Sequence, residues 1–177
     1  TVLRFPSAAE QADPPTQRRR QAALMTDAET LGRELLADGP SDPRGPVLLA
    51  HLAVQQRRWV EGFLLLDRAL ASSRIDAASL RTAAHLHAMA GYRQRALELA
   101  LAAARLDPLN AVNHQALAFF HGLLGDDARM REHAGIAQEL GDRMAVVYQG
   151  IAALRAGEWA QAEAATVEGL RGAGVAH

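Results

Sequence analysis

The stretch from Ala77 to Asn110 reads AASLRTAAHLHAMAGYRQRALELALAAARLDPLN and decides the fold class. Alanine, leucine, arginine and glutamine, all strong helix formers, dominate it on both sides of one break. The break is Ala90-Gly91-Tyr92, and the stretch closes with Asp107-Pro108. Glycine and proline end helices at such points. The stretch therefore predicts two helices, at about 76–90 and 92–106, which a short turn forces to pack antiparallel.

A step of 34 residues from this stretch finds the same arrangement again. Units begin at 43, 77 and 111, and a fourth begins at 143 if the third unit is two residues short. Several positions hold a small residue in nearly every unit. Position 8 reads Ala50, Ala84, Ala118 and Gly150; position 15 reads Arg57, Gly91, Gly125 and Gly157; position 20 reads Gly62, Ala96, Met130 and Ala162; position 27 reads Ala69, Ala103, Ala137 and Gly169. Small side chains let two antiparallel helices approach closely, and a glycine between them supplies the backbone conformation that ends the first helix.

The same reading extends to both ends of the chain. Further helices are expected at about 46–56, 59–72, 110–123, 126–140, 143–156 and 158–171. Residues 16–42 form a degenerate leading unit, and whether they make one helix or two stays open, because Thr26 to Glu29 has the form of a capping box. Residues 1–15 are expected to be an irregular arm. Residues 43–177 are expected to be one continuous domain of four repeats, at 43–76, 77–110, 111–142 and 143–174.

The 34-residue unit resembles the repeat of the tetratricopeptide-repeat (TPR) family. That family has small residues at positions 8, 20 and 27 and a proline near position 32. Ala84, Gly91, Ala96, Ala103 and Pro108 match this pattern, whereas the family's tryptophan at position 4 and tyrosine at position 11 are replaced throughout. The resemblance implies an all-α fold, a TPR-like solenoid of antiparallel helix pairs in a right-handed superhelix. It also implies a non-catalytic protein–protein interaction role.

The amino-acid composition excludes several classes of function. The net charge is −1, so the chain as a whole lacks the basic footprint of a nucleic-acid-binding protein. It has no cysteine, which excludes disulfides and thiolate metal sites. No apolar run is long enough to span a membrane. A cytoplasmic location is expected, and a periplasmic one after removal of a signal stays open.

The seven histidines do not form a recognisable metal or catalytic motif. His85 and His87 are two residues apart, so they point to different sides of a helix. His114 and His121 share a face but lie two turns apart, too far for one ion. His87 and His121 occupy position 11, where a partly buried histidine replacing an aromatic residue is expected. No phosphate loop or nucleophile motif is present. We therefore expect no cofactor, no metal and no enzymatic activity.

The resemblance places the binding surface on the first helix of each pair, where positions 2, 5, 9, 12 and 13 line a concave groove. The residues carried over as partner-binding are Arg44, Val47, His51, Arg81, His85, Met89, Gln115, Phe119, Leu123, Val147 and Ile151. His51, His85 and Phe119 share position 9. The groove grades from basic and polar near Arg44 and Arg81 to apolar near Ile151. This polarity suits a peptide or amphipathic helix with an acidic end and an apolar end.

Other occupants of the groove remain open. A second copy of the protein is the main alternative, because an apolar strip is rarely left bare. For the function as a whole, the first alternative is a regulatory or docking segment of an enzyme system whose catalytic part lies on another chain. The second alternative is a homo-oligomerising structural module.

Overall fold

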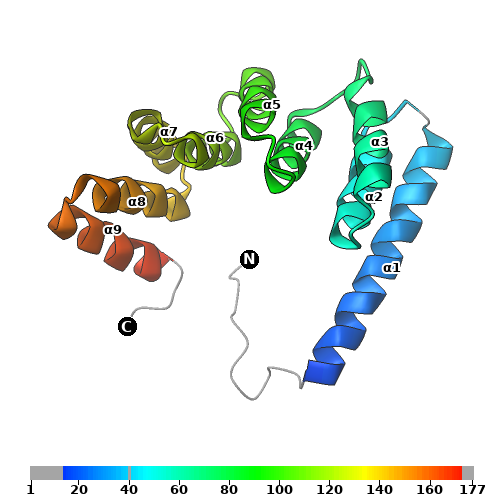
Figure 1. The fold of residues 1–177 in the computed structure, drawn as a ribbon, viewed down its shortest axis with the longest axis horizontal. Helices are drawn as coiled ribbons and strands as arrows, with labels where there is room; N and C mark the ends of the chain where they lie inside the picture. Colours follow the sequence, from blue (N-terminus) through cyan, green and yellow to red (C-terminus); the bar gives the residue numbers. More distant parts are fainter. Residues whose placement is uncertain (1–13, 40, 173–177) are drawn as a thin grey trace. The chain divides into compact units, whose positions relative to one another are not determined.

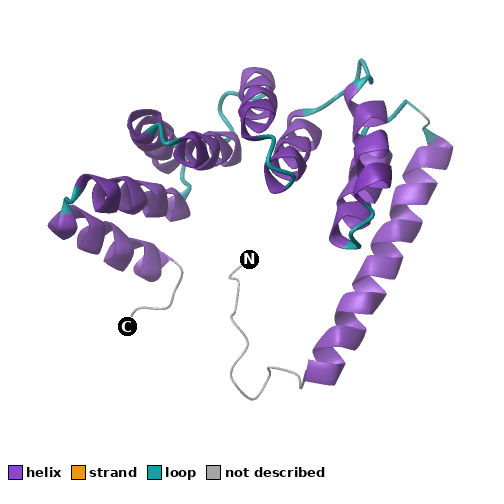
Figure 2. Ribbon diagram, in the orientation of Figure 1, coloured by secondary structure: helices purple, strands orange, loops and turns teal. Residues whose placement is uncertain are grey.

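The computed structural model describes residues 14–39 and 41–172, in two compact units. Unit 1 ends at Ser72 and contains α1 (Pro14–Asp38), α2 (Arg44–Gln55) and α3 (Trp59–Leu70). Unit 2 begins at Ser73 and contains α4 (Ala77–Met89), α5 (Arg93–Leu106), α6 (Ala111–Leu124), α7 (Asp127–Glu139), the 3-10 turn η1 (Arg143–Ala145), α8 (Val146–Ala156) and α9 (Trp159–Gly172) (Figure 1). Within the described ranges every regular element is helical, as Figure 2 shows.

The predicted helices from α2 to α7, and α9, are present with bounds that differ from the prediction by at most two residues. The helix predicted at 143–156 differs at its start, which is the 3-10 turn η1 instead of regular helix. Asp142 caps this turn by accepting a hydrogen bond from the Met144 amide at 3.0 Å.

The leading segment forms a single helix, α1. Its threonines do not start a second helix, because the Thr26 hydroxyl donates to the Ala22 carbonyl at 3.1 Å inside the continuous helix. The helix begins at Pro14, two residues inside the stretch that was expected to be an irregular arm. Proline suits a first helical turn, where its missing N–H costs nothing. The rest of that arm, residues 1–13, lies outside the described residues.

The turn within each helix pair has the left-handed backbone that the position-15 glycines predict. The φ angles are 89° at Gly91, 80° at Gly125 and 75° at Gly157. Unit 1 has Arg57 at this position, with φ 64°. Arg57 therefore adopts a left-handed backbone conformation, which costs an L-residue more conformational energy than it costs glycine.

The small-residue positions are the sites of closest helix contact. Ala50, Ala84 and Ala118 at position 8 are fully buried, and Ala69, Ala103 and Ala137 at position 27 are at most 1% exposed. These contacts pack α2 on α3, α4 on α5, α6 on α7 and α8 on α9 as antiparallel pairs. In unit 2, successive pairs also pack on one another: α5 packs on α6, and α7 packs on α8.

Candidate protein-binding surface

The first helix of each pair in unit 2 carries eight of the predicted partner-binding residues, which we call the inner face. They are Arg81, His85 and Met89 on α4, Gln115, Phe119 and Leu123 on α6, and Val147 and Ile151 on α8. Met89 is 55% exposed and Val147 is 39% exposed, while Gln115, Phe119 and Leu123 are half-buried. The inner face therefore combines exposed and half-buried side chains, and none of the eight is fully buried.

The centre of the inner face is a pair of stacked rings. The His85 and Phe119 rings lie 5.7 Å apart between centroids and are inclined by 10°. Two contacts hold the His85 ring in place. Its Nδ1 lies 2.9 Å from the Arg81 carbonyl, and it makes an edge-to-face contact with the buried Phe120 ring. The predicted position-9 row is thus present in unit 2, where an exposed imidazole lies over a half-buried phenyl ring.

Arg81 is positioned by Asn113, a residue that the sequence did not single out. Its guanidinium Nη1 donates to Asn113 Oδ1 at 2.7 Å, and Asn113 is fully buried. The Asn113 amide in turn donates to the Asp107 carbonyl at 2.8 Å. None of the described carboxylates forms an ion pair with Arg81, so its positive charge is available to an acidic ligand.

At the other end of the inner face, on α8, the positive charge of Arg155 is neutralised by an ion pair. Arg155 follows Ile151 by one turn of α8, and its guanidinium lies 2.6 Å from Asp127 and 3.0 Å from the Gly122 carbonyl. Val147 and Ile151 line an apolar cavity of about 210 Å³ between α8 and α9. Within the described part of the chain, the inner face therefore has an unneutralised cation on α4 and an apolar end on α8.

The three predicted residues of unit 1 have other surroundings. Val47 is only 7% exposed and belongs to the core of its unit, so its side chain is not offered to a partner. Arg44 pairs with Asp42 at 2.6 Å. His51 is exposed, and its Nε2 lies 3.3 Å from the Gln55 amide nitrogen. We retain Arg44 and His51 as candidates on unit 1 and leave out Val47.

A histidine cluster lies between α6 and α7, outside the inner face. His114 Nδ1 lies 3.2 Å from His133 Nδ1, and the His121 and His133 rings stack with centroids 5.4 Å apart. His121 is 2% exposed and His87 is 8% exposed, which confirms that the position-11 histidines are buried. The sequence missed His133, which joins two histidines that lie two turns apart on α6.

Burial sets the protonation of this cluster. Burial lowers the pKa of the His133 imidazole, and the neighbouring His114 and His121 rings lower it further. Burial also lowers the pKa of His121, although the Asp126 carboxylate opposes this. Both rings are therefore kept neutral near pH 7.

Residues 14–39 and 41–172 contain neither a metal-binding cluster of three or more side chains nor a membrane-spanning helix. No group of three or more histidine, aspartate or glutamate side chains there is placed to hold a metal ion. None of the helices in these ranges combines the length and apolar character needed to cross a membrane.

No family model matches the sequence, and no curated protein matches it. Solved structures do match the fold. MamA aligns with TM-score 0.68 and 14% identity, over 90% of this chain and 94% of MamA. TTC0263, a thermophilic TPR protein of Thermus thermophilus, aligns with TM-score 0.69 and 19% identity, over 87% of this chain and 86% of its own. YrrB, a TPR protein with an unusual peptide-binding site, aligns with TM-score 0.65 and 10% identity, over 86% of this chain and 79% of its own. Together with the repeated helix pairs, these matches identify the fold of this chain as the tetratricopeptide-repeat fold.

Proposed function

We propose that this protein is a non-catalytic interaction module whose inner face binds a peptide or helix of a partner protein. The observation that carries the proposal is the open stack of His85 on Phe119, with exposed Met89 beside it on α4. Stacked rings at the centre of an exposed face are typical anchors for a partner side chain. The peptide-binding site named for YrrB, which has a similar fold, supports the same class of function.

The charge distribution supports one orientation of the bound segment. Arg81 has no carboxylate partner among the described residues, whereas Arg155 is already paired with Asp127. An acidic residue of the partner contributes most to the binding free energy beside Arg81 on α4, where it meets an unneutralised cation. The apolar end of the segment then lies toward Val147 and Ile151. The partner is thus proposed to be an amphipathic segment that is acidic at one end.

Site-specific photocross-linking in the native cell tests the inner face. A photoreactive phenylalanine analogue placed at Met89 is expected to capture a defined partner protein. The same analogue at Leu109, 80% exposed in the turn between α5 and α6, is the matched control and should not capture it. Phe119→Ala should lower the capture by about tenfold, which is the loss of one anchor of about 1.4 kcal/mol.

Equal capture from Met89 and Leu109 contradicts the proposal, because the partner then does not recognise the inner face. A cross-link from Met89 to a second copy of the protein supports self-association instead. Arg81→Glu tests the orientation, since it should weaken capture more at low salt than at high salt.

A further inference from the structure

His114 on α6 and His133 on α7 face each other through their Nδ1 atoms, which lie 3.2 Å apart. The ring centroids are 5.4 Å apart, and the two ring planes are inclined by 34°. Both side chains are half-buried, so each is partly open to solvent. A pair of nitrogen donors that solvent can reach therefore joins the two helices of this repeat.

The separation of the two Nδ1 atoms matches that of two ligands on one transition-metal ion. Imidazole nitrogens bind Zn²⁺ at about 2.0–2.1 Å, so two of them at a square-planar or tetrahedral angle lie about 2.9–3.4 Å apart. The observed 3.2 Å falls inside this range. A small rotation of each ring about its Cβ–Cγ bond would turn both lone pairs toward one point. The backbones of α6 and α7 thus already have the spacing that a shared ion needs.

A backbone carbonyl fixes the orientation of His114. Its Nε2 lies 2.9 Å from the Pro108 carbonyl oxygen, which can only accept a hydrogen bond, so Nε2 carries a hydrogen. In the neutral ring the Nδ1 atom is then the bare nitrogen, and its lone pair faces His133. Histidines that bind metals usually donate the hydrogen of the other ring nitrogen to a carbonyl or carboxylate in this way. His114 is therefore oriented as a ligand before any ion arrives.

We infer that His114 and His133 together bind a divalent late transition-metal ion, such as Zn²⁺, through their Nδ1 atoms. Water completes the coordination, since no third side chain among the described residues is placed to hold the ion. The His121 ring stacks on His133 with centroids 5.4 Å apart, and it positions that ring without being a ligand. The ion links α6 to α7 and stabilises this helix pair, because the unfolded chain does not hold the two rings together.

The surrounding charges and the donor atoms fit such an ion. The Glu132 carboxylate acts on the His133 ring more strongly than the Arg129 guanidinium does. Glu132 is exposed on α7, so it adds negative charge beside the pair. Imidazole nitrogen suits Zn²⁺, Cu²⁺ and Ni²⁺, whereas Mg²⁺ and Ca²⁺ prefer oxygen ligands. The pair is therefore expected to discriminate between these two groups of ions.

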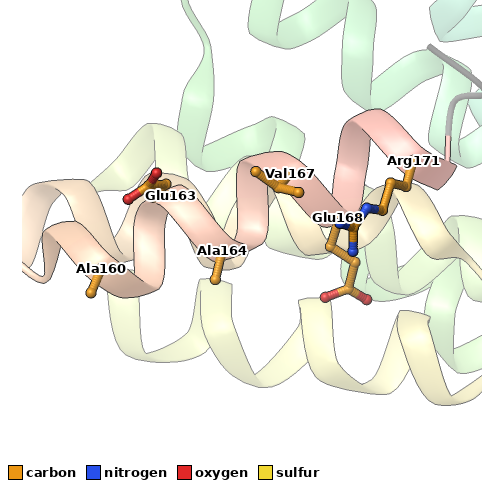
Figure 3. A pocket seen from close by; sticks show the side chains of 6 residues that line it. All are labelled: Ala160, Glu163, Ala164, Val167, Glu168 and Arg171. Carbon is orange, nitrogen blue, oxygen red and sulfur yellow. The ribbon is translucent and has the colours of Figure 1, made fainter. Parts of the chain in front are cut away.

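The carboxylates on α9 do not form a competing site. Glu163 and Glu168 both line a hollow of about 550 Å³ on this helix. Their carboxylates point apart, and Glu168 lies beside Arg171 (Figure 3). Two carboxylates that diverge in this way cannot share one ion. Glu163→Gln is consequently a suitable control for zinc binding elsewhere on the chain.

Isothermal titration calorimetry with Zn²⁺ alone tests the inference on the full chain, prepared without a histidine tag and stripped with a chelator. Saturable binding of one ion per chain is expected, with no binding of Mg²⁺. His114→Gln and His133→Gln should each weaken zinc binding by at least about tenfold, because each removes a ligand. His51→Gln and Glu163→Gln should leave the zinc affinity unchanged. Absence of saturable binding overturns the inference, as does native affinity in either ligand variant.

Nitrogen NMR of the imidazole rings gives a second readout on the native chain, which stays decisive if a ligand variant fails to fold. Zinc should shift the Nδ1 resonances of His114 and His133 and leave both Nε2 atoms protonated. It should also raise the urea midpoint of the native chain and leave that of His133→Gln unchanged. Zinc-induced shifts at His51 or His85 in place of the pair would overturn the inference, and so would coordination through Nε2.

Discussion

Gly122 on α6 and Met130 on α7 form a matched pair, in which the missing side chain of one makes room for the large side chain of the other. A Cβ built at Gly122 would lie 2.6 Å from Met130 Sδ. Unit 1 has the reverse arrangement at the same two repeat positions, where a Cβ at Gly62 would lie 2.8 Å from Val54 Cγ2. Unit 2 also has Ala88 and Ala96 at these positions. The bulk between the two helices is thus divided differently from pair to pair.

Gly122→Ala is expected to destabilise the protein by about 1 kcal/mol. Overpacking against buried Met130 costs about 1–3 kcal/mol, and the better helix propensity of alanine returns about 1 kcal/mol. Met130→Ala alone should cost about 2–4 kcal/mol through the cavity it leaves. Urea denaturation measures each variant.

The double variant Gly122→Ala/Met130→Ala recreates the alanine pair of the preceding repeat. Its loss in the free energy of unfolding should be smaller than the sum of the two single losses by at least about 1 kcal/mol. The reason is that the new methyl group partly fills the cavity. Strict additivity would contradict the matched-pair account.

Arg57→Gly is expected to stabilise the protein by about 0.5–1 kcal/mol. Among the described residues Arg57 alone has positive φ without being glycine, and the left-handed region costs an L-residue about 1–2 kcal/mol. Part of that gain is lost to the greater freedom of glycine in the unfolded chain. Thermal and urea unfolding measure the change.

Arg58→Gly is the matched control for this turn. Arg58 has φ −86° and pairs with Glu61, so its replacement removes an ion pair and relieves no backbone strain. It should leave stability unchanged or lower. An equal gain from both substitutions would mean that φ at Arg57 is not the cause.

Asn113→Leu is expected to lower the free energy of unfolding by about 2 kcal/mol. Asn113 is fully buried and joins the Arg81 guanidinium to the Asp107 carbonyl, so leucine would leave both polar groups without that partner. Gln115→Leu, two residues away on the inner face, should change stability by less than about 0.5 kcal/mol. Comparable losses from the two variants would show that the Asn113 hydrogen bonds contribute little.

Stability should fall as the pH drops below about 6.5, the ordinary histidine pKa. The folded state lowers the pKa of His121 and His133, so it binds fewer protons than the unfolded state in this range. The stabilisation is complete above that pH and is lost as the pH falls toward the lowered values. Asp126, Arg129 and Glu132 also act on these rings, with Asp126 and Glu132 opposing the shift of His121.

His133→Gln should flatten this pH dependence, measured as the difference between urea midpoints at pH 7.5 and pH 5. It removes one titrating ring and relieves the repulsion that a charged His133 would impose on His121. His51→Gln, on exposed surface of unit 1, is the control and should keep the native slope. The same slope in both variants would place the acid sensitivity elsewhere.

Much of the fold could be predicted because the decisive signals are local. Small residues at positions 8 and 27 and the turn glycines report contacts within one helix pair, and such contacts leave a fixed spacing in the sequence. Arg57 and Met130 depart from this pattern. The backbone angle φ explains Arg57, and the glycine opposite it on the partner helix explains Met130.

The surroundings of individual residues were harder to predict, because they depend on which side chains the packing brings together, between pairs for Asn113 and within one pair for His133. Asn113 resembles any polar helix residue until Arg81 and Asp107 are placed around it. His133 had no visible relation to His114 and His121, since the three meet only when α7 packs on α6. Val47 fell in a groove position of the repeat, yet the packing of unit 1 buries it.

The exchange of bulk between positions 12 and 20 has a consequence for how such repeats diverge. Val54 with Gly62, Ala88 with Ala96, and Gly122 with Met130 differ strongly at each position taken singly, while one member or both stay small. We expect selection on this fold to act on the two positions together. Related sequences should show correlated substitutions between the two positions, with little conservation at either one alone.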